Sequence, residues 1–275
     1  MFISIVTPSY NRYQLLKESI YSSIKAAQET EAQIELIIVD DASTDNTYEQ
    51  IQHDFSDFFK SGSFRIFRLA KNMGVTAAKN FGAKQSSGQW VLFLDSDDLL
   101  ISESFGGLIN DLQTHHAESA IFFKCVDFDG NLIGKPGSDQ SINLKYYIKH
   151  GFHGERLPVI KREVITFFPY EDQLRGFEGL AYYRMLASGL SIRLSDLAAR
   201  KYRTKNIDRL SSRKALIKRA STMRTGYKLL IDEYKKARIK LGWRIAIRYF
   251  YYQILCTPLI IAPIYVYLKK IILHK

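Results

Sequence analysis

The densest group of side chains that could do chemistry directly follows an apolar run at residues 90–94. Asp95, Asp97 and Asp98 stand within four positions of one another. Carboxylates this close repel one another, so their spacing favours a cation or a donor-rich ligand between them. Oxygen ligands select Mg²⁺ or Mn²⁺, which typically keeps water and shares its shell with a diphosphate. We expect Asp97 to bind such a metal, whereas Asp98 also suits a turn or a helix cap.

A second acidic pair, Asp40 and Asp41, follows another apolar run and precedes the polar segment 43–47. One of these carboxylates could accept a hydrogen bond from the imide N–H of a uracil or from a ribose hydroxyl, while the polar segment suits a helix cap. Pro8 and Tyr10 follow the first apolar run and could flank a base, because a flat aromatic ring offers a stacking face. These residue types point to a nucleotide ligand.

The first hundred residues alternate short apolar runs with amphipathic stretches, which is typical of βαβ units and of a parallel sheet covered on both faces. Open α/β sheets bind ligands beyond the carboxyl ends of their strands, so the polar loops after the first four strands form one candidate site. The expected strands are 2–6, 35–39, 64–68, 90–94 and 120–127, and the expected helices are 13–27, 46–55, 75–85, 103–114, 178–188 and a basic amphipathic stretch at 213–241.

Composition excludes several classes of protein. A chain of 275 residues with 46% apolar residues can fill a large core, which excludes intrinsic disorder. Two cysteines provide neither a disulfide framework nor a thiolate zinc site, and they indicate a reducing compartment. Residues 200–275 hold 20 Lys and Arg residues against three acidic ones, whereas the rest of the chain is net acidic. This basic end predicts an anionic partner surface, either nucleic acid or acidic lipid headgroups.

The C-terminal end also carries an apolar segment. Residues 249–268 include no charged side chain, and a helix of 20 residues would span about 30 Å of hydrocarbon. Pro258 and Pro263 interrupt the segment, and tyrosines cluster near both of its ends, where they suit a membrane interface. We expect a membrane-associated segment here, with a buried helical hairpin as the alternative. Because no cleavable signal opens the sequence, the N-terminal part is expected in the cytoplasm.

Four segments resemble, in order, the signatures of GT-A glycosyltransferases of family two: TPSYNR at 7–12, VDDASTDNT at 39–47, NMGVTAAKN at 72–80 and DSDD at 95–98. The resemblance implies an α/β GT-A fold, which is a Rossmann-like, mixed, mainly parallel sheet flanked by helices. It also implies a nucleotide-sugar donor, with UDP as the expected nucleotide, a divalent metal (Mn²⁺ or Mg²⁺) and inversion at the anomeric carbon. The expected domains are a catalytic domain at 1–205, a basic amphipathic helical region at 206–242 and a hydrophobic membrane-associated segment at 243–275.

The resemblance assigns roles to residues by position. Asp41 resembles the residue that holds the base, and Pro8 and Tyr10 resemble those that pack around the nucleoside. Asp95 resembles the first acid of the family's Asp-X-Asp motif, near the ribose. Asp97 resembles the metal ligand of that motif.

Two further positions depart from the family's pattern. Lys79 stands where the family often has arginine, which keeps a positive charge near the donor but loses bidentate geometry. The segment 201–205 resembles one in which a histidine often completes the metal shell. A protonated lysine cannot replace that ligand, so Arg203 or Lys205 either contacts the diphosphate or belongs to a basic surface.

Inverting transfer needs a general base that takes the proton of the acceptor hydroxyl as its oxygen attacks the anomeric carbon. In the resembled family, an acidic pair at the start of a helix supplies it. Glu178 aligns better by the helix that follows, although Gly179 replaces the usual aspartate, and Asp172 belongs to an intact Glu-Asp pair slightly earlier. We predict Glu178 as the base, with Asp172 as the alternative. A carboxylate at a helix start is also favourable without any catalytic role.

These features predict a membrane-associated inverting glycosyltransferase on the cytoplasmic face of a bacterial inner membrane. Its basic end would bind an anionic membrane surface, and not nucleic acid, near a saccharide or polyprenyl-diphosphate-linked acceptor. The alternatives are a non-catalytic module that binds membrane or nucleic acid, and a sugar-phosphate nucleotidyltransferase. The glycine-rich phosphate loop expected of the latter is missing, and the absence of glycine from 7–12 also disfavours a dinucleotide-dependent oxidoreductase.

Overall fold

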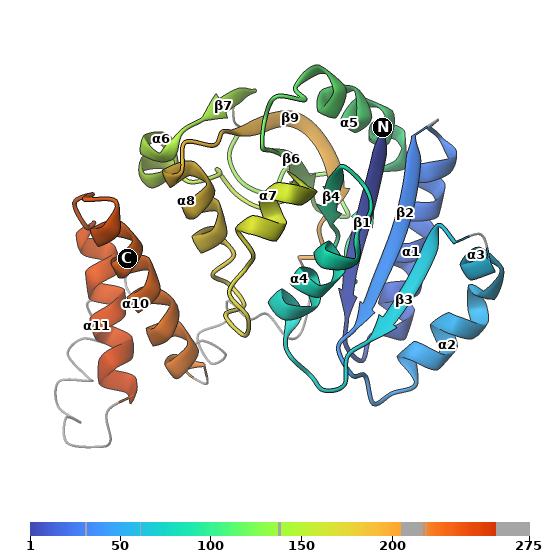
Figure 1. Cartoon of the computed structure of the whole chain (residues 1–275), viewed down its shortest axis with the longest axis horizontal. Helices are drawn as coiled ribbons and strands as arrows, with labels where there is room; N and C mark the ends of the chain where they lie inside the picture. Colours follow the sequence, from blue (N-terminus) through green and yellow to red (C-terminus); the bar gives the residue numbers. More distant parts are fainter. Residues whose placement is uncertain (31, 61, 137–138, 205–216, 218, 257–275) are drawn as a thin grey trace. The chain divides into compact units, whose positions relative to one another are not determined.

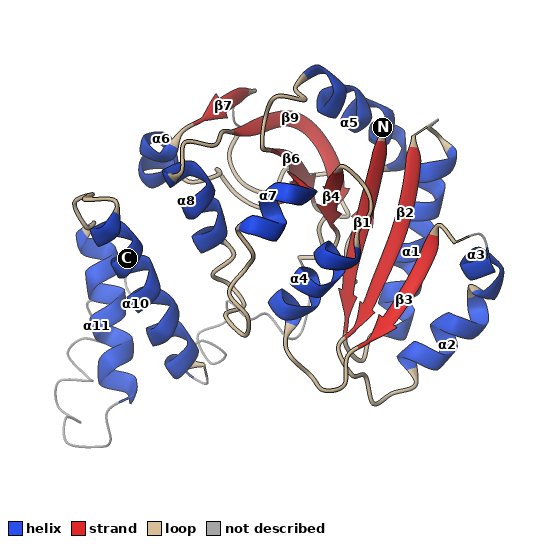
Figure 2. Cartoon of the chain, viewed as in Figure 1, coloured by secondary structure: helices blue, strands red, loops and turns tan. Residues whose placement is uncertain are grey.

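The computed structural model describes residues 1–30, 32–60, 62–136, 139–204, 217 and 219–256. They form a mixed β-sheet with helices on both faces, followed by a pair of helices (Figures 1 and 2). The strands are β1 (Phe2–Ser9), β2 (Gln33–Asp40), β3 (Phe64–Arg68), β4 (Trp90–Phe93), β5 (Leu99–Leu100), β6 (Ala120–Val126), β7 (Gln140–Ile142), β8 (Arg156–Lys161) and β9 (Ile192–Lys201). The helices are α1 (Tyr13–Gln28), α2 (Thr47–Asp54), α3 (Ser56–Lys60), α4 (Val75–Gln85), α5 (Ser102–Thr114), α6 (Leu144–His150), α7 (Arg162–Phe167), α8 (Gly179–Ala187), α10 (Ala220–Lys236) and α11 (Trp243–Cys256).

The sheet has the strand order β3-β2-β1-β4-β8-β6-β9-β5, and β7 pairs with β9. Strands β1 to β4 are all parallel to their neighbours within this set. Strand β8 is antiparallel to both β4 and β6, whereas β6 and β9 are again parallel. The chain runs outward from β1 to β3 and then returns to β4 on the other side of β1. This change of direction is the point at which open α/β sheets open a crevice for ligands.

Two hydrophobic clusters cover the two faces of the sheet. Helices α1, α2 and α5 supply one cluster, and α4, α7 and α8 supply the other. Successive residues of a strand point to opposite faces, so Ile38 of β2 packs in the first cluster and Ile37 in the second. Burial on both faces explains why the strands contain continuous apolar runs, and the predicted α/β fold with a mixed sheet is confirmed.

The predicted elements of the first hundred residues match the structure closely. Helix α4 has the predicted bounds, and β1 continues for three residues beyond the predicted end at 6. The sequence analysis missed β5, β7, β8, β9 and the short helices α3, α6 and α7. Most of these elements lie between residues 140 and 201, where charged residues interrupt the apolar pattern and every missed element except β9 is short.

Glu35 of β2 is a buried charge that fastens the amino-terminal edge of the sheet. It is 4% exposed, its Oε2 accepts from Arg65 at 2.6 Å, and its Oε1 accepts from the hydroxyl of Ser4 and the amide of Gly88. Burial opposes ionisation, but the hydrogen bonds from Ser4 and Ser87 and the charge of Arg65 outweigh it and lower the pKa of Glu35.

The variant Glu35→Gln is expected to lose about 1.5–3 kcal/mol of unfolding free energy at pH 7, because it removes hydrogen bonds to a charged group. The pKa of Glu35 in the folded chain lies below its ordinary value of 4.5, so the stabilisation is fully present above that pH and disappears as the pH falls through the folded value. Urea titrations at pH 7 and at pH 4 and below would measure this. An equal difference between variant and parent at every pH would contradict it.

The chain divides into two compact units, Met1–Lys205 and Asn206–Lys275. In the second unit, α10 and α11 pack together through tyrosines. The rings of Tyr252 and Tyr227 are stacked, with their centroids 5.8 Å apart, and the ring centroids of Tyr251 and Tyr252 lie 5.1 Å apart. Tyr251 and Tyr252 are 8% and 6% exposed, so they form the packed side of α11. The sequence analysis had instead expected these tyrosines at a membrane interface. The sequence analysis placed a membrane segment at 249–268, of which residues 257–268 lie outside the described part of the chain.

Within that described part, every helix is too short or too polar to cross a bilayer. Of the two cysteines, Cys125 is buried and Cys256 is partly exposed.

Candidate functional site

The loops that follow β1 and β2 are joined directly by hydrogen bonds. Ser9 and Asp40 are paired in the parallel register of these strands, so both loops leave the sheet at the same level. The amide of Asn11 donates to the hydroxyl of Ser43 at 2.9 Å, and the amide of Thr44 donates to Asn11 Oδ1 at 2.8 Å. These contacts give the carboxyl end of the sheet a defined rim.

Asp41 joins this rim to the start of α4. Its two carboxylate oxygens accept from the backbone amides of Met73 at 2.7 Å and Gly74 at 2.8 Å. Gly74 has a φ of +88°, a conformation that side chains with a Cβ adopt only with strain. Burial raises the pKa of Asp41, while the two amides act in the opposite direction. A carboxylate has about four lone-pair positions, so Asp41 retains acceptor capacity for a base.

The other residues expected around a nucleoside lie beside the same rim. Pro8 is buried within β1, one residue before the strand ends. Tyr10 follows the strand and is 41% exposed, so its ring is accessible to a ligand.

Lys79 of α4 pairs with Asp95 at the end of β4. The Lys79 Nζ and Asp95 Oδ1 atoms are 2.8 Å apart, and the lysine side chain is only 11% exposed. Burial opposes ionisation of Asp95, but the charges of Lys79 and Arg200 outweigh it and lower the pKa of Asp95 to about 2. The charge of Arg175, from the loop before α8, acts in the same direction. Asp95 is therefore a fixed negative charge at neutral pH.

Arg12, from the loop after β1, pairs with Asp97. Its guanidinium nitrogen lies 2.9 Å from Asp97 Oδ2, and the Asp97 side chain is 16% exposed. The main chain at Asp97 is held as well, because Arg203 Nε donates to its carbonyl oxygen at 3.1 Å. The carboxylate predicted to bind a metal thus lies beside two arginines, at the carboxyl end of β4.

Asp98 is the most buried acid of this loop, at 1% exposed. Its Oδ1 accepts from the amide of Arg203 at 2.9 Å, and its Oδ2 lies 3.3 Å from the buried guanidinium of Arg200. Burial raises the pKa of Asp98 to about 7, and the neighbouring Asp95 adds to this, whereas Arg200 opposes it. These contacts join the acidic loop to the end of β9, which is a structural role like the turn or cap expected from the sequence.

Arg203 makes its contacts within this scaffold. Its Nη2 donates to Glu18 at 2.9 Å, and its guanidinium carbon lies 4.5 Å from the centre of the Phe128 ring. With the bonds to Asp97 and Asp98, these contacts favour a role in positioning the acidic loop over a direct contact with diphosphate. Lys205, the other predicted cation of this segment, lies outside the described residues.

The two candidate bases lie in and beside the loop between α7 and α8. Glu178 is the residue before α8 begins, is partly exposed, and its Oε2 accepts from the amide of Gly176 at 2.9 Å. Asp172 is exposed, and its Oδ1 accepts from Asn80 of α4 at 2.9 Å. Asn80 also binds both the amide and the carbonyl of Tyr170, so this loop is fastened to the helix that carries Lys79.

The charges of Glu178 and Asp95 both act on one buried pair of tyrosines. The hydroxyls of Tyr170 and Tyr182 are 2.9 Å apart. Burial raises the pKa of Tyr170 well above 10, and the negative charges of Glu178 and Asp95 act in the same direction. The same two charges act on Tyr182. The structure therefore gathers most of the predicted site residues that it describes at one end of the sheet.

Three functional candidates escaped the sequence analysis. Arg12 lies inside the first motif, but only the fold shows that it meets Asp97. Arg200 follows two alanines near the end of β9, and it pairs with the buried Asp98, a contact that only the fold reveals. Arg175 gave no sign in the sequence, because it lies in a loop whose path depends on Asn80 and Tyr170.

The acidic loop offers few protein ligands to a divalent cation. Among the described residues, no group of three or more His, Cys, Asp or Glu side chains could hold a metal ion. The carboxylate of Asp97, with Asp95 beside it in sequence, instead offers the one or two oxygen ligands that Mg²⁺ or Mn²⁺ uses when phosphates and water complete its shell. Because Asp97 is paired with Arg12, a cation at this carboxylate requires the guanidinium to move or share it.

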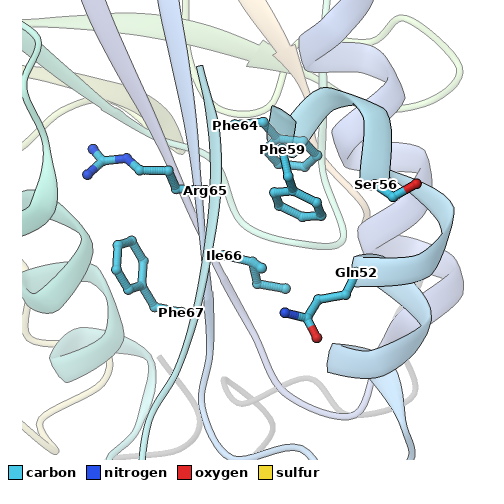
Figure 3. A pocket seen from close by; sticks show the side chains of 7 residues that line it. All are labelled: Gln52, Ser56, Phe59, Phe64, Arg65, Ile66 and Phe67. Atoms are coloured by element: carbon cyan, nitrogen blue, oxygen red, sulfur yellow. The ribbon is translucent and has the colours of Figure 1, made fainter. Parts of the chain in front are cut away.

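A surface hollow beside the edge strand β3 lies apart from these loops. In Figure 3, Phe59, Phe64, Ile66 and Gln52 lie between β3 and the helices, while Arg65 and Phe67 point to the opposite side of the strand. Its one charged lining residue, Arg65, is already paired with Glu35 at 2.6 Å. The hollow offers apolar contact but no converging reactive groups.

Comparisons with known proteins agree with this geometry. The family model described as Glycosyl transferase family 2 matches residues 4–168, which include most of β1, the strands β2 to β8 and the acidic loop. An uncharacterized glycosyltransferase of Haemophilus influenzae is 33% identical over 171 residues, which cover 62% of this chain and 66% of that protein.

Two further relatives carry functional names. The GalNAc(5)-diNAcBac-PP-undecaprenol beta-1,3-glucosyltransferase of Campylobacter jejuni is 27% identical over 66% of this chain and 59% of its own. The Escherichia coli protein WfaP, named UDP-Glc:alpha-D-GlcNAc-diphosphoundecaprenol beta-1,3-glucosyltransferase, is 27% identical over 73% of this chain and 76% of its own. The chain spans slightly less than two thirds of the Haemophilus and Campylobacter relatives.

Solved structures share the fold at lower sequence identity. TarS from S. aureus in complex with UDP-GlcNAc superposes with a TM-score of 0.66 and 18% identity, over 94% of this chain and 74% of that one. The mannosyltransferase PcManGT from Pyrobaculum calidifontis, in complex with GDP-Man and Mn²⁺, has a TM-score of 0.60 and 14% identity, over 92% and 73%. These superpositions confirm the predicted GT-A architecture.

Proposed function

Because the chain belongs to glycosyl transferase family 2, which confirms the predicted enzyme class, we propose that it transfers a sugar from a nucleoside diphosphate donor to an acceptor hydroxyl with inversion. The observation that carries this proposal is the meeting of the strand-end loops, where two carboxylates at the end of β4 lie against Lys79 and Arg12. A nucleotidyltransferase, the other enzyme considered from the sequence, is set aside by the family match.

We propose that Asp41, Pro8 and Tyr10 hold the nucleoside. Asp41 has remaining acceptor capacity for an imide N–H, and its bonds to Met73 and Gly74 fix its position. Tyr10 offers an exposed ring for stacking beside the buried Pro8. UDP is the first candidate nucleotide, supported by UDP-Glc in the name of WfaP and by UDP-GlcNAc in the TarS complex.

The diphosphate would lie over the acidic loop. Asp97 is the residue proposed to hold Mg²⁺ or Mn²⁺, and a bound cation supplies positive charge for the departing diphosphate. The Mn²⁺ in the PcManGT complex supports this assignment by analogy of fold. Lys79 keeps Asp95 ionised and oriented near the proposed ribose position. Arg12 and Arg175 are further cations of this neighbourhood that could meet phosphate oxygens.

Glu178 is proposed as the general base. Its carboxylate stands at the entrance to α8, is partly exposed, and shares an electrostatic neighbourhood with Asp95 through the Tyr170–Tyr182 pair. From there it would accept the proton of the acceptor hydroxyl as the oxygen attacks the anomeric carbon. Its bond to the amide of Gly176 orients the carboxylate. Asp172, bound by Asn80, is the alternative base.

We propose a saccharide on a polyprenyl diphosphate as the acceptor, and the cytoplasmic face of a bacterial inner membrane as the location. The support is that two relatives are named for diphosphoundecaprenol or PP-undecaprenol acceptors, together with the excess of positive charge in residues 200–275. We propose further that residues 206–242 and 243–275 hold the catalytic domain, 1–205, near an anionic membrane surface.

A screen of nucleotide sugars with Mn²⁺ or Mg²⁺, which reads the released nucleoside diphosphate, tests the proposed function. We expect release with at least one UDP-sugar, more release when a polyprenyl-diphosphate-linked saccharide is present, and loss of release with chelator. Binding of UDP without turnover on any donor and acceptor pair would instead identify a non-catalytic module.

A further inference from the structure

Helix α11 presents an apolar face that α10, its neighbour among the described residues of the second unit, does not cover. Trp243, Ile247 and Phe250 follow one another at spacings of four and three residues, which places them on one side of a helix. They are 65%, 38% and 64% exposed. The packing partner α10 is met by other residues of α11, namely Tyr252, which stacks on Tyr227, and Arg248, which donates to the Tyr227 hydroxyl at 3.1 Å.

Positive charge surrounds this face. Residues 219–256 contain nine Lys and Arg residues against two acidic ones. Four of the cations are exposed at the end of α10 and in the connection to α11, directly before Trp243: Lys235, Lys236, Arg238 and Lys240. The guanidinium of Arg244 lies 5.4 Å from the Trp243 ring, so a cation also accompanies the most exposed aromatic. The two acidic residues are Asp232 and Glu233, and Glu233 is paired with Lys236 at 3.1 Å.

We infer that the face formed by Trp243, Ile247 and Phe250 lies in the interface of an anionic lipid bilayer, parallel to the membrane plane. A helix with aromatic and aliphatic residues on one side and Lys and Arg around it binds at the boundary of headgroups and acyl chains. Each cation near the surface gains from acidic headgroups, and tryptophan favours the same depth. A second copy of the chain fits worse, because it would bring like charges together.

This inference differs from the membrane segment expected at 249–268. The lipid-facing residues begin at Trp243, whereas Tyr251 and Tyr252 belong to the packed side of α11. The biological reason for membrane binding rests on the proposed function, because a lipid-linked acceptor lies at a membrane. The physical argument rests on the exposed face of α11 and on the cations around it.

Tryptophan fluorescence tests it directly, because the chain contains two tryptophans. Trp90 is 3% exposed in the core, so a change in emission on vesicle binding reports Trp243, which is 65% exposed. With vesicles of phosphatidylcholine and phosphatidylglycerol, we expect a blue shift and quenching by brominated acyl chains. Vesicles of phosphatidylcholine alone should bind much more weakly. The variant Trp243→Phe should lose the signal but still sediment with the anionic vesicles.

The double variant Trp243→Ser/Phe250→Ser is expected to reduce partition into anionic vesicles by about tenfold or more, because it removes two large apolar side chains from the contact. The matched control is Phe167→Ser, which removes a 77% exposed phenylalanine from α7 and should bind like the parent. Circular dichroism would verify that each variant is folded.

Equal sedimentation of the double variant and the parent would overturn the inference, as would unchanged Trp243 emission on bound vesicles. Concentration-dependent dimerisation that the double variant abolishes would assign the face to a second copy instead. Donor turnover without vesicles should be the same in the double variant and the parent. Absence of turnover in the parent would therefore contradict the proposed function and leave the lipid result to be judged separately.

Discussion

Replacing Asp97 with alanine is expected to lower donor turnover by about 10³-fold, because a catalytic metal contributes several kcal/mol and each tenfold corresponds to about 1.4 kcal/mol. The variant removes the carboxylate proposed to hold the cation, while Asp95 keeps its ion pair with Lys79 at 2.8 Å. The measurement is release of nucleoside diphosphate at saturating Mn²⁺ with the donor identified by the screen. Asp97→Asn, which keeps the shape but removes the charge, should show a similar loss.

Asp54→Ala is the matched control for Asp97. Asp54 also forms an ion pair, with Lys17 at 2.6 Å, and its side chain is 23% exposed, but it belongs to the last turn of α2 and not to the loop that follows β4. We expect Asp54→Ala to turn over donor like the parent. Full activity of a folded Asp97→Ala variant, or equal loss in both variants, would contradict the role given to Asp97.

The second large effect is expected from Glu178. The change to glutamine removes the proposed base, and general base catalysis contributes about 10²–10⁴-fold, so kcat should fall by that factor. Donor affinity should change little, because Glu178 binds the amide of Gly176 and is not among the residues proposed to hold the donor. Steady-state kinetics with varied acceptor, together with calorimetric titration of UDP, separates the two quantities.

Asp172→Asn distinguishes the two candidate bases. The asparagine can keep the hydrogen bond with Asn80 through its amide oxygen, so the loop should remain in place. If Glu178 is the base, Asp172→Asn should retain most of the activity. A large fall in kcat for Asp172→Asn, with Glu178→Gln unaffected, would transfer the role to Asp172.

The sequence predicted the first half of the fold well because β1, β2 and β4 are buried on both faces over most of their length. Continuous apolar runs then mark the strands, and helical spacing marks the helices between them, as the bounds of α4 demonstrate. The carboxyl ends of parallel strands lie at one end of a sheet, so the order along the chain was enough to place Asp41 and Asp95 at that same end. The motifs added the family and the residue types expected at each loop.

The rest of the site depends on contacts between segments far apart in sequence. Arg12 meets Asp97 across 85 positions, and Asn80 holds Asp172 across 92. Neither pair has a local pattern that announces it. Strand β9 was missed because Arg193, Asp196 and Arg200 interrupt its apolar residues, yet their charges are paired with acids or lysines in the fold. Because these charges are paired, β9 can form within the sheet although its apolar pattern alone does not indicate a strand.

The central claim is that a cation at Asp97 joins the chain to the diphosphate of its donor. Calorimetric titration of UDP into the parent chain, with Mn²⁺ and then with chelator in its place, tests this most directly. The account predicts binding with Mn²⁺ that is lost with chelator, and a much smaller difference between the two conditions for Asp97→Ala. Equal UDP affinity of the parent chain with Mn²⁺ and with chelator would contradict it.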